Sequence, residues 1–213
     1  MPASPNNRLG KRVPERKRGW DTVTAGGCMP GIVDWPARMR EVAEFVGLGP
    51  AELELVRSTA PVIGKLAEEL TASVYDQFLR FPEARKFFLA ADSQVDQERL
   101  VRRKESLARW LRGSINFQID ADYPVRVLAT GVVHSHPPAH RAHLGSIPSR
   151  YMVGTISFIQ TALSDAFHLE MDDPDQAIRA SVAWNKLLMV QLDVLLAGYV
   201  TETPIQPVEE GTS

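Results

Sequence analysis

Apolar residues along this 213-residue chain recur at helical spacing over most of its length. The strongest pattern lies between residues 61 and 81, where an apolar side chain stands at every fourth position. Its members are Val62, Leu66, Leu70, Val74 and Phe78. Such spacing lines one face of a helix, and no run of residues shows the sustained alternation of a half-buried strand. The pattern therefore predicts an all-α protein.

Two shorter helices are expected before this one. Asp34 can cap a leading helix, because its side chain can accept from the free N–H groups of the first turn. The apolar face of that helix is expected to consist of Met39, Val42 and Phe45. A second helix is expected from about Pro50 to Ser58, and Pro61 suits the first turn of the third.

Four further helices are expected after residue 81. The segment 82–89 turns a corner, and Asp92 or Ser93 can cap the helix that follows. The next helix opens at Asp120 or Asp122 and ends before Pro137, because the residue preceding a proline is pushed out of the helical region. Two long helices complete the chain, with apolar faces that include Met152, Thr155, Ile156, Ile159, Leu163 and Phe167 in one and Trp184, Leu188, Gln191 and Leu195 in the other. The total is roughly seven or eight helices joined by short loops.

Composition limits the number of domains and the classes of partner. With 44% apolar residues, the chain can bury one sizeable core. We expect a basic N-terminal tail over residues 1–33, one domain over 34–200 and a polar tail over 201–213, with Met29 as an alternative start to Met1. The formal charge of −2 gives no basic field for nucleic acid, and no apolar run reaches the roughly 18 residues of a membrane span. The single cysteine, Cys28, fits a cytoplasmic protein.

Four of the five histidines lie between residues 134 and 143. A structural zinc site wants four ligands, but Cys28 is distant and there is no HExxH motif, so zinc is disfavoured. His136, His140 and His143 are best explained as loop histidines. His134 differs, because it lies on the apolar face of its helix, three residues after Gly131, which would let a flat ring approach the backbone. It is a candidate iron ligand, and a satisfied core histidine is the alternative.

Catalytic motifs offer no competing assignment. The chain contains no G-x-S-x-G, no phosphate-binding lysine loop and no G-x-G-x-x-G. Most carboxylates lie at helix starts, where capping explains them.

The order of several segments resembles the protoglobin and globin-sensor family across residues 34–200. The segments are Glu69–Phe88, Arg109-Trp110, Gly131-Val-Val-His134 and Ala183–Gln191. This resemblance implies a globin fold with an extra N-terminal helix that binds haem b. It makes His134 the proximal iron ligand and Tyr75 the distal hydrogen-bond donor. The other implied cofactor-binding residues are Phe88, Leu107, Trp110, Gly131, Thr155 and Ile159, and one basic side chain from 99–105 could meet a propionate.

Two features depart from the family pattern. Val74 stands where the family has a tryptophan beside the distal tyrosine, which would change gas access. The long loop after His134 contains Pro137 and Pro138 and leaves His136 and His140 as alternative ligands.

The implied function is reversible binding of O₂, CO or NO, as a sensor, scavenger or carrier. The last two apolar helices, Met152–His168 and Ala177–Tyr199, could pair two copies as a homodimer, and a signalling partner would be a separate protein. NO dioxygenase or peroxidase chemistry is expected at most as a side activity, because no distal acid–base pair is evident. The alternative is a haem-free globin-like domain for stress sensing or protein interaction.

Overall fold

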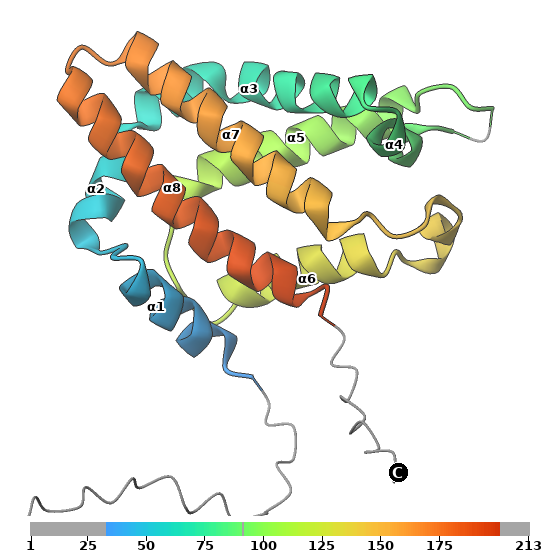
Figure 1. Ribbon diagram of the computed structural model, residues 1–213, viewed down its shortest axis with the longest axis horizontal. Helices are drawn as coiled ribbons and strands as arrows, with labels where there is room; N and C mark the ends of the chain where they lie inside the picture. The colour runs from blue at the N-terminus through green and yellow to red at the C-terminus, as the bar shows by residue number, and fades with distance from the viewer. Residues whose placement is uncertain (1–32, 91, 201–213) are drawn as a thin grey trace, which may run out of the picture. The chain divides into compact units, whose positions relative to one another are not determined.

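A computed structural model describes residues 33–90 and 92–200. Within these ranges the chain forms eight α-helices and two short 3₁₀ helices, η1 and η2 (Figure 1). Their bounds are α1 Trp35–Phe45, α2 Pro50–Ser58, α3 Ala60–Arg80, α4 Pro82–Arg85, η1 Lys86–Phe88, α5 Gln97–Ser114, α6 Tyr123–Ser135, η2 Ala139–Leu144, α7 Ser149–Glu170 and α8 Pro174–Ala197. Extended pairing in the same ranges is limited to one bridge between Leu89 and Val95. The predicted all-α class is confirmed.

The predicted tails lie outside the described residues, apart from Val33. Cys28 and Met29 lie outside them as well.

Local capping explains where several helices begin. The Asp34 carboxylate accepts a hydrogen bond from the Ala37 N–H at 2.9 Å, as predicted. Before α6, Asp120 accepts from the N–H groups of Asp122 and Tyr123 at 2.9 and 2.6 Å, so Asp120 is the acceptor of the two candidates. The prediction that Asp92 or Ser93 caps α5 was wrong.

The cap of α5 is Asp96, which accepts from the Arg99 N–H at 2.9 Å. Asp92 instead accepts from the Gln94 N–H at 3.0 Å, inside a turn that the Leu89–Val95 bridge closes. That turn delays the start of the helix to Gln97.

Helix α8 lies at the centre of the domain and packs against α1, α2, α6 and α7. In Figure 1 it runs across the front, antiparallel to α7. Its fully buried side chains include Trp184, Leu187, Leu188, Val190 and Val194. By length and composition α8 would suit a membrane span, but half of its apolar window is buried inside the domain. It is the core helix of this fold.

The predicted apolar face of α1 was partly wrong. Met39 and Ala43 face the core, whereas Phe45 is 90% exposed. Helix α1 rests on α8 and α6, and only one narrow face of so short a helix reaches them. An ion pair between Arg38 and Asp193, at 2.8 Å, ties α1 to α8 at the surface.

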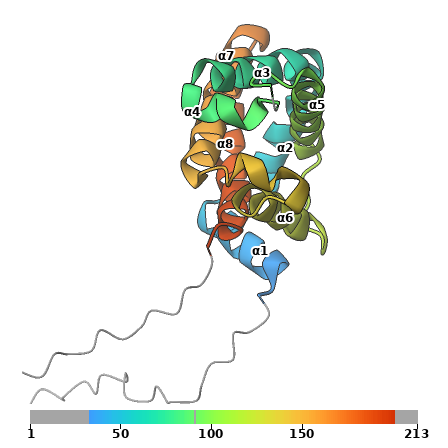
Figure 2. The ribbon, with the colours of Figure 1, turned by 90° about the vertical axis from the view of Figure 1, so that its right-hand side faces the viewer.

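Helices α3 and α5 pack against each other, and α7 closes over α3. Figure 2 views the end of the domain where α4 and η2 lie, with α3 and α5 above and α6 below. The side chains considered next converge at this end.

Candidate functional site

A cavity of about 390 Å³ lies between α3, α5, α6 and α7. A second cavity of about 100 Å³ adjoins it toward α4 and η2. Five residues line both, namely Tyr75, Phe78, Arg103, His134 and Met152. The larger volume falls in the usual range of small-molecule and cofactor sites.

His134 lies in the last turn of α6 and lines both cavities. Its Nδ1 lies 2.6 Å from the carbonyl oxygen of Thr130, one helical turn earlier. A carbonyl oxygen only accepts, so Nδ1 carries the proton and the neutral ring keeps the lone pair on Nε2. This is the tautomer in which a histidine offers Nε2 to a metal.

The surroundings of His134 favour the neutral ring. Burial lowers the pKa of His134, and the nearby guanidinium groups of Arg103 and Arg141 lower it as well, while the bond to Thr130 opposes them. The imidazole is therefore kept in its ligating form.

The other histidines of the 134–143 segment lie elsewhere. His136 is exposed, with Nδ1 2.8 Å from the Ser135 hydroxyl, and His143 is exposed on η2. The side chain of His140 lies outside the described residues. No group of three or more His, Cys, Asp or Glu side chains gathers in the described part of the chain.

Gly131 lies on a different face of α6 from the one expected. A Cβ atom placed on it would lie 2.0 Å from the carbonyl oxygen of Leu195. The absence of a side chain on Gly131 therefore lets the backbone of α8 approach α6 closely. Gly131 does not line the cavity.

Tyr75 lies on α3 across the cavity from α6. Its ring packs edge-on against Phe78 and Phe88, with centroids 5.7 and 5.6 Å away. No hydrogen bond joins its hydroxyl to another described residue, and Tyr75 lines both cavities. Burial raises the pKa of Tyr75 to about 12, so the phenol stays protonated at neutral pH. Phe88 lines the smaller cavity.

The remaining predicted residues line the larger cavity. Leu107 and Trp110 come from α5, and Thr155 and Ile159 come from α7. The Thr155 hydroxyl is bonded to the Tyr151 carbonyl at 2.6 Å, so it acts within its own helix. Leu107, Trp110 and Ile159 give this cavity an apolar part of its wall.

Arginines supply the charge around the cavities. Arg103 lines both, Arg126 the larger and Arg99 and Arg141 the smaller, whereas no Asp or Glu is found among the lining residues that the structure describes. Arg99 pairs with Asp96 at 3.1 Å. Arg141 is different: its Nε is buried and has no hydrogen-bond partner within the described ranges.

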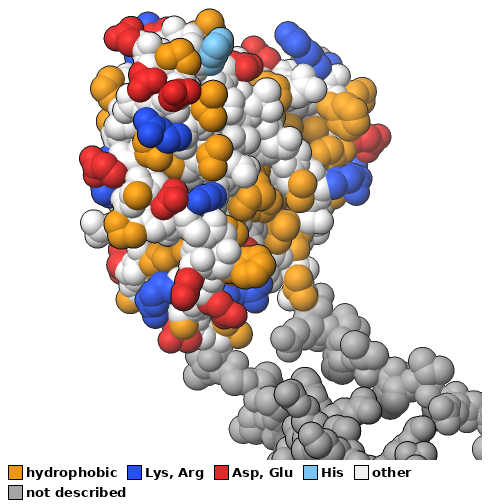
Figure 3. Space-filling model, turned by 60° about the vertical axis from the view of Figure 1, so that its left-hand side comes forward, with side chains coloured by type: hydrophobic (Ala, Val, Ile, Leu, Met, Phe, Trp, Pro, Cys, Tyr) orange, Lys and Arg blue, Asp and Glu red, His pale blue; other side chains and the backbone are white. Residues whose placement is uncertain are grey.

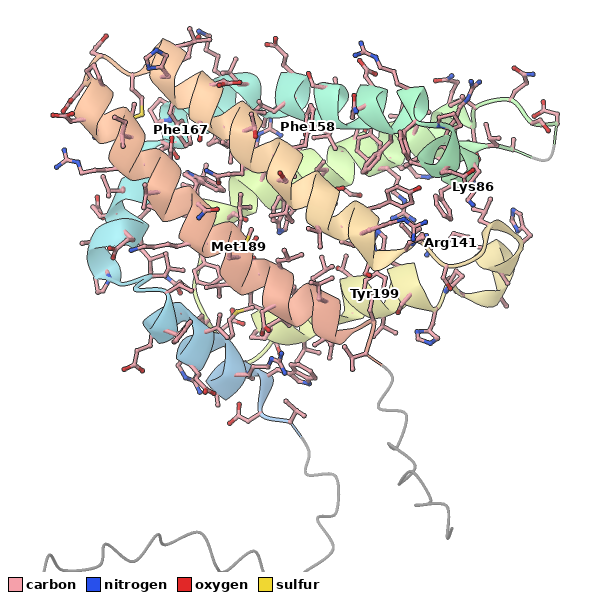
Figure 4. The ribbon with its side chains drawn as sticks, in the orientation of Figure 1. Lys86, Arg141, Phe158, Phe167, Met189 and Tyr199 are labelled. Carbon is pink, nitrogen blue, oxygen red and sulfur yellow. The ribbon has the colours of Figure 1, made fainter. Side chains whose placement is uncertain are left out.

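Figure 4 shows Arg141 pointing from η2 toward the body of the domain. Burial lowers the pKa of Arg141, and Arg103 and Arg99 lower it further. Converging cations with little negative charge between them fit an anionic ligand group.

Sequence reasoning missed several wall residues. Arg126 and Thr130 precede His134 by eight and four residues on one helical stripe, so periodicity could have found them. Tyr123 accepts a hydrogen bond from the buried Gln191 amide at 2.7 Å, a long-range pairing with no signal in the sequence. The inward direction of Arg141 depends on how the loop folds.

Comparison with known proteins gives a consistent picture of the fold. Residues 36–204 match the family model described as Protoglobin. The chain is similar to the globin domain of the Geobacter sulfurreducens globin-coupled sensor, with 20% identity and a TM-score of 0.60 over 76% of this chain and 97% of that one. It is also similar to the ferric globin domain of E. coli DosC, with 15% identity and a TM-score of 0.57 over 76% and 99% of the two chains. No curated protein matches the chain.

Proposed function

Because the chain belongs to the protoglobin family, we propose that it binds haem b in the cavity beside His134 and holds a diatomic gas there reversibly. The observation that carries this proposal is the state of His134. Its Nδ1 is engaged by the Thr130 carbonyl, which leaves the Nε2 lone pair available to a metal in the cavity that His134 lines.

The residues present fit the size and chemistry of haem. The two adjoining cavities are walled by apolar side chains from α3, α5 and α7, which suit a flat porphyrin. Phe88, Leu107, Trp110 and Ile159 would pack against its faces. Arg141 and Arg103 offer guanidinium groups to the two propionates, and the buried Nε of Arg141 would gain a partner.

When bound, haem iron supplies an open coordination position for O₂, CO or NO. The chain supplies the surroundings of that position. His134 would hold the iron through Nε2, and the Tyr75 hydroxyl would donate a hydrogen bond to the bound gas. Leu107, Trp110 and Ile159 would limit the access of water to the bound group.

The absorbance spectrum tests this proposal most directly. Purified protein reconstituted with haem should show a Soret band, and the ferrous form should bind CO. Replacing His134 with alanine should abolish the five-coordinate ferrous spectrum, whereas His136→Ala should leave it intact. If His136→Ala removes the spectrum instead, the ligand assignment is wrong.

A haem-free interaction domain is the competing function. A helical, folded protein with no Soret band after reconstitution would support it and refute the gas-binding proposal.

The proposed role in the cell is gas sensing in the cytoplasm. The matched globin domain of Geobacter sulfurreducens belongs to a protein described as a globin-coupled sensor. A signalling partner would then read the gas-bound state of this domain.

We also propose a homodimer through α7 and α8. Three apolar side chains are exposed on α8, namely Ile178, Val182 and Met189. Ile178 and Val182 line a groove between α7 and α8, and Met189 follows them along α8. Figure 3 shows hydrophobic side chains exposed among charged ones on this side of the molecule. A two-fold axis would bring the same apolar side chains of two copies together.

Light scattering after gel filtration tests the dimer. Val182→Arg should give a monomer, because a charge would be buried at the contact. Val101→Arg on α5 is the matched control, since Val101 and Val182 are 53% and 51% exposed. A dimer that survives Val182→Arg would rule out this interface.

A further inference from the structure

Helices α6 and α8 cross with their backbones in direct contact. A Cβ atom on Gly198 would lie 2.6 Å from the Val132 nitrogen and 2.8 Å from the Gly131 carbonyl carbon. From the opposite side, a Cβ atom on Gly131 would lie 2.0 Å from the Leu195 carbonyl oxygen. Each glycine therefore leaves room for the backbone of the other helix.

A buried hydrogen bond joins the helices at the same crossing. The Ser135 hydroxyl donates to the Gly198 carbonyl at 2.7 Å. Ser135 immediately follows His134, so the last turn of α6 is tied directly to the end of α8.

The loop after α6 holds the other side of this turn. The Ile147 N–H donates to the carbonyl of His134 at 2.9 Å, and the Ser146 hydroxyl donates to the carbonyl of Ser135 at 2.5 Å. The backbone that carries His134 is thus held by α8 and by the loop together.

We propose that Gly198 and Ser135 are positioning residues that set how far the His134 imidazole reaches into the cavity. Thr130 and His134 share the cavity face of α6, whereas Gly131 and Ser135 share the face that meets α8. The inference rests on the proposed haem function and assigns the geometry of its iron ligand to a contact outside the cavity.

Backbone contact makes this positioning stiff. Side-chain contacts can adapt by changing rotamer, but two backbones that touch have no such freedom. A displacement of the α8 end must therefore move α6, and the imidazole moves with the helix that carries it.

The size of the effect follows from the Gly198 geometry. Gly198 has φ −68° and ψ −8°, which alanine adopts without strain, so only the added methyl group matters. Relief to ordinary van der Waals separation, about 3.5 Å, requires a movement of roughly 0.9 Å from the 2.6 Å contact. Metal–ligand distances hold to within about 0.2 Å, so a backbone movement of this size is expected to shift the position in which the imidazole would meet the iron.

The experiment compares Gly198→Ala with Gly64→Ala in haem-reconstituted protein. Gly64 lies inside α3, and a Cβ atom there meets nothing within 4 Å. Resonance Raman spectra of the ferrous form report the iron–histidine stretch, and transfer of haem to an acceptor globin reports its release. We expect Gly198→Ala to shift the stretching band and to speed haem release about tenfold, and Gly64→Ala to change neither.

A second pair of variants covers the case in which Gly198→Ala fails to fold. Ser135→Ala removes the hydrogen bond without adding bulk, and Ser135→Thr keeps a hydroxyl. Ser135→Ala should shift the stretching band, and Ser135→Thr should restore it toward the wild-type position. Amide hydrogen exchange in the haem-free protein should show faster exchange in α6 for Gly198→Ala and Ser135→Ala than for Gly64→Ala.

The outcomes separate the inference from the function on which it rests. Wild-type protein without a His134-dependent haem spectrum would overturn the proposed function itself. A normal wild-type spectrum combined with an unshifted iron–histidine band in folded Gly198→Ala, or in Ser135→Ala, would overturn the positioning role alone.

Discussion

Replacing Tyr75 with phenylalanine removes one hydroxyl from the cavity wall and leaves the ring in place. The ring contacts with Phe78 and Phe88 depend on packing alone, so they persist in the variant. Because the hydroxyl has no hydrogen-bond partner among the described residues, its removal leaves no buried group unsatisfied. The change is therefore confined to what the hydroxyl does for a gas molecule in the cavity.

The magnitude follows from the worth of one neutral hydrogen bond, about 0.5–1.5 kcal/mol. Lost from the gas-bound state alone, this energy corresponds to a roughly 2- to 10-fold faster dissociation of O₂. The free energy of unfolding should stay about the same, since the hydroxyl has no hydrogen-bond partner among the described residues to lose.

Tyr123→Phe is the matched control, because Tyr123 lines the same cavity. Its hydroxyl accepts a hydrogen bond from the Gln191 amide at 2.7 Å, and Gln191 is buried. Losing that acceptor should lower the free energy of unfolding by about 1–3 kcal/mol. The O₂ dissociation rate should not change.

Stopped-flow displacement of O₂ by CO measures the dissociation rate, and urea unfolding measures stability. The expected result is a crossed pattern, with Tyr75→Phe changing the rate and Tyr123→Phe changing the stability. An unchanged dissociation rate in Tyr75→Phe would refute the distal role of Tyr75. A faster rate in Tyr123→Phe alone would transfer that role to Tyr123.

Three further predictions concern pH, charge and the core. Burial raises the pKa of Tyr75 to about 12, so Tyr75 of the unfolded chain loses its proton at a lower pH than in the folded protein. The folded protein should therefore keep its full free energy of unfolding below about pH 10 and lose up to about 3 kcal/mol of it as the pH rises toward about 12. Urea unfolding at several pH values should find a smaller loss in Tyr75→Phe. Arg141→Met should speed haem release about tenfold or more, because it removes a charge-assisted hydrogen bond. The melting temperature of the haem-free protein should stay the same or rise. Unchanged haem release would show that Arg141 does not bind a propionate. Thr59→Val should lower the free energy of unfolding by about 1–3 kcal/mol, because the buried Trp184 Nε1 donates to the Thr59 hydroxyl at 3.0 Å. Thr59→Ser keeps the hydroxyl and should retain most of the stability. Equal losses in both variants would show that packing outweighs the hydrogen bond.

The sequence by itself located the main helices, because the spacing and capping that mark them involve residues a few positions apart. Apolar spacing located the long helices α3, α7 and α8, and the bounds of α2 agree with the predicted Pro50–Ser58. Capping by Asp34 involves a donor only three residues away. The same periodicity placed His134 on the face of α6 that meets a cavity.

Only the tertiary structure decided which neighbour covers each face. Periodicity marked Phe45 as inward and put Gly131 on the same face of its helix as His134, but the placement of α1 leaves Phe45 in solvent, and the buried Gly131 meets the backbone of α8. Arg141 and Gln191 reach their surroundings through loops and long-range packing, so no local pattern could show their direction. The sequence pattern shows which side chains share a face of one helix. Which neighbour covers that face depends on how all the helices pack into one core.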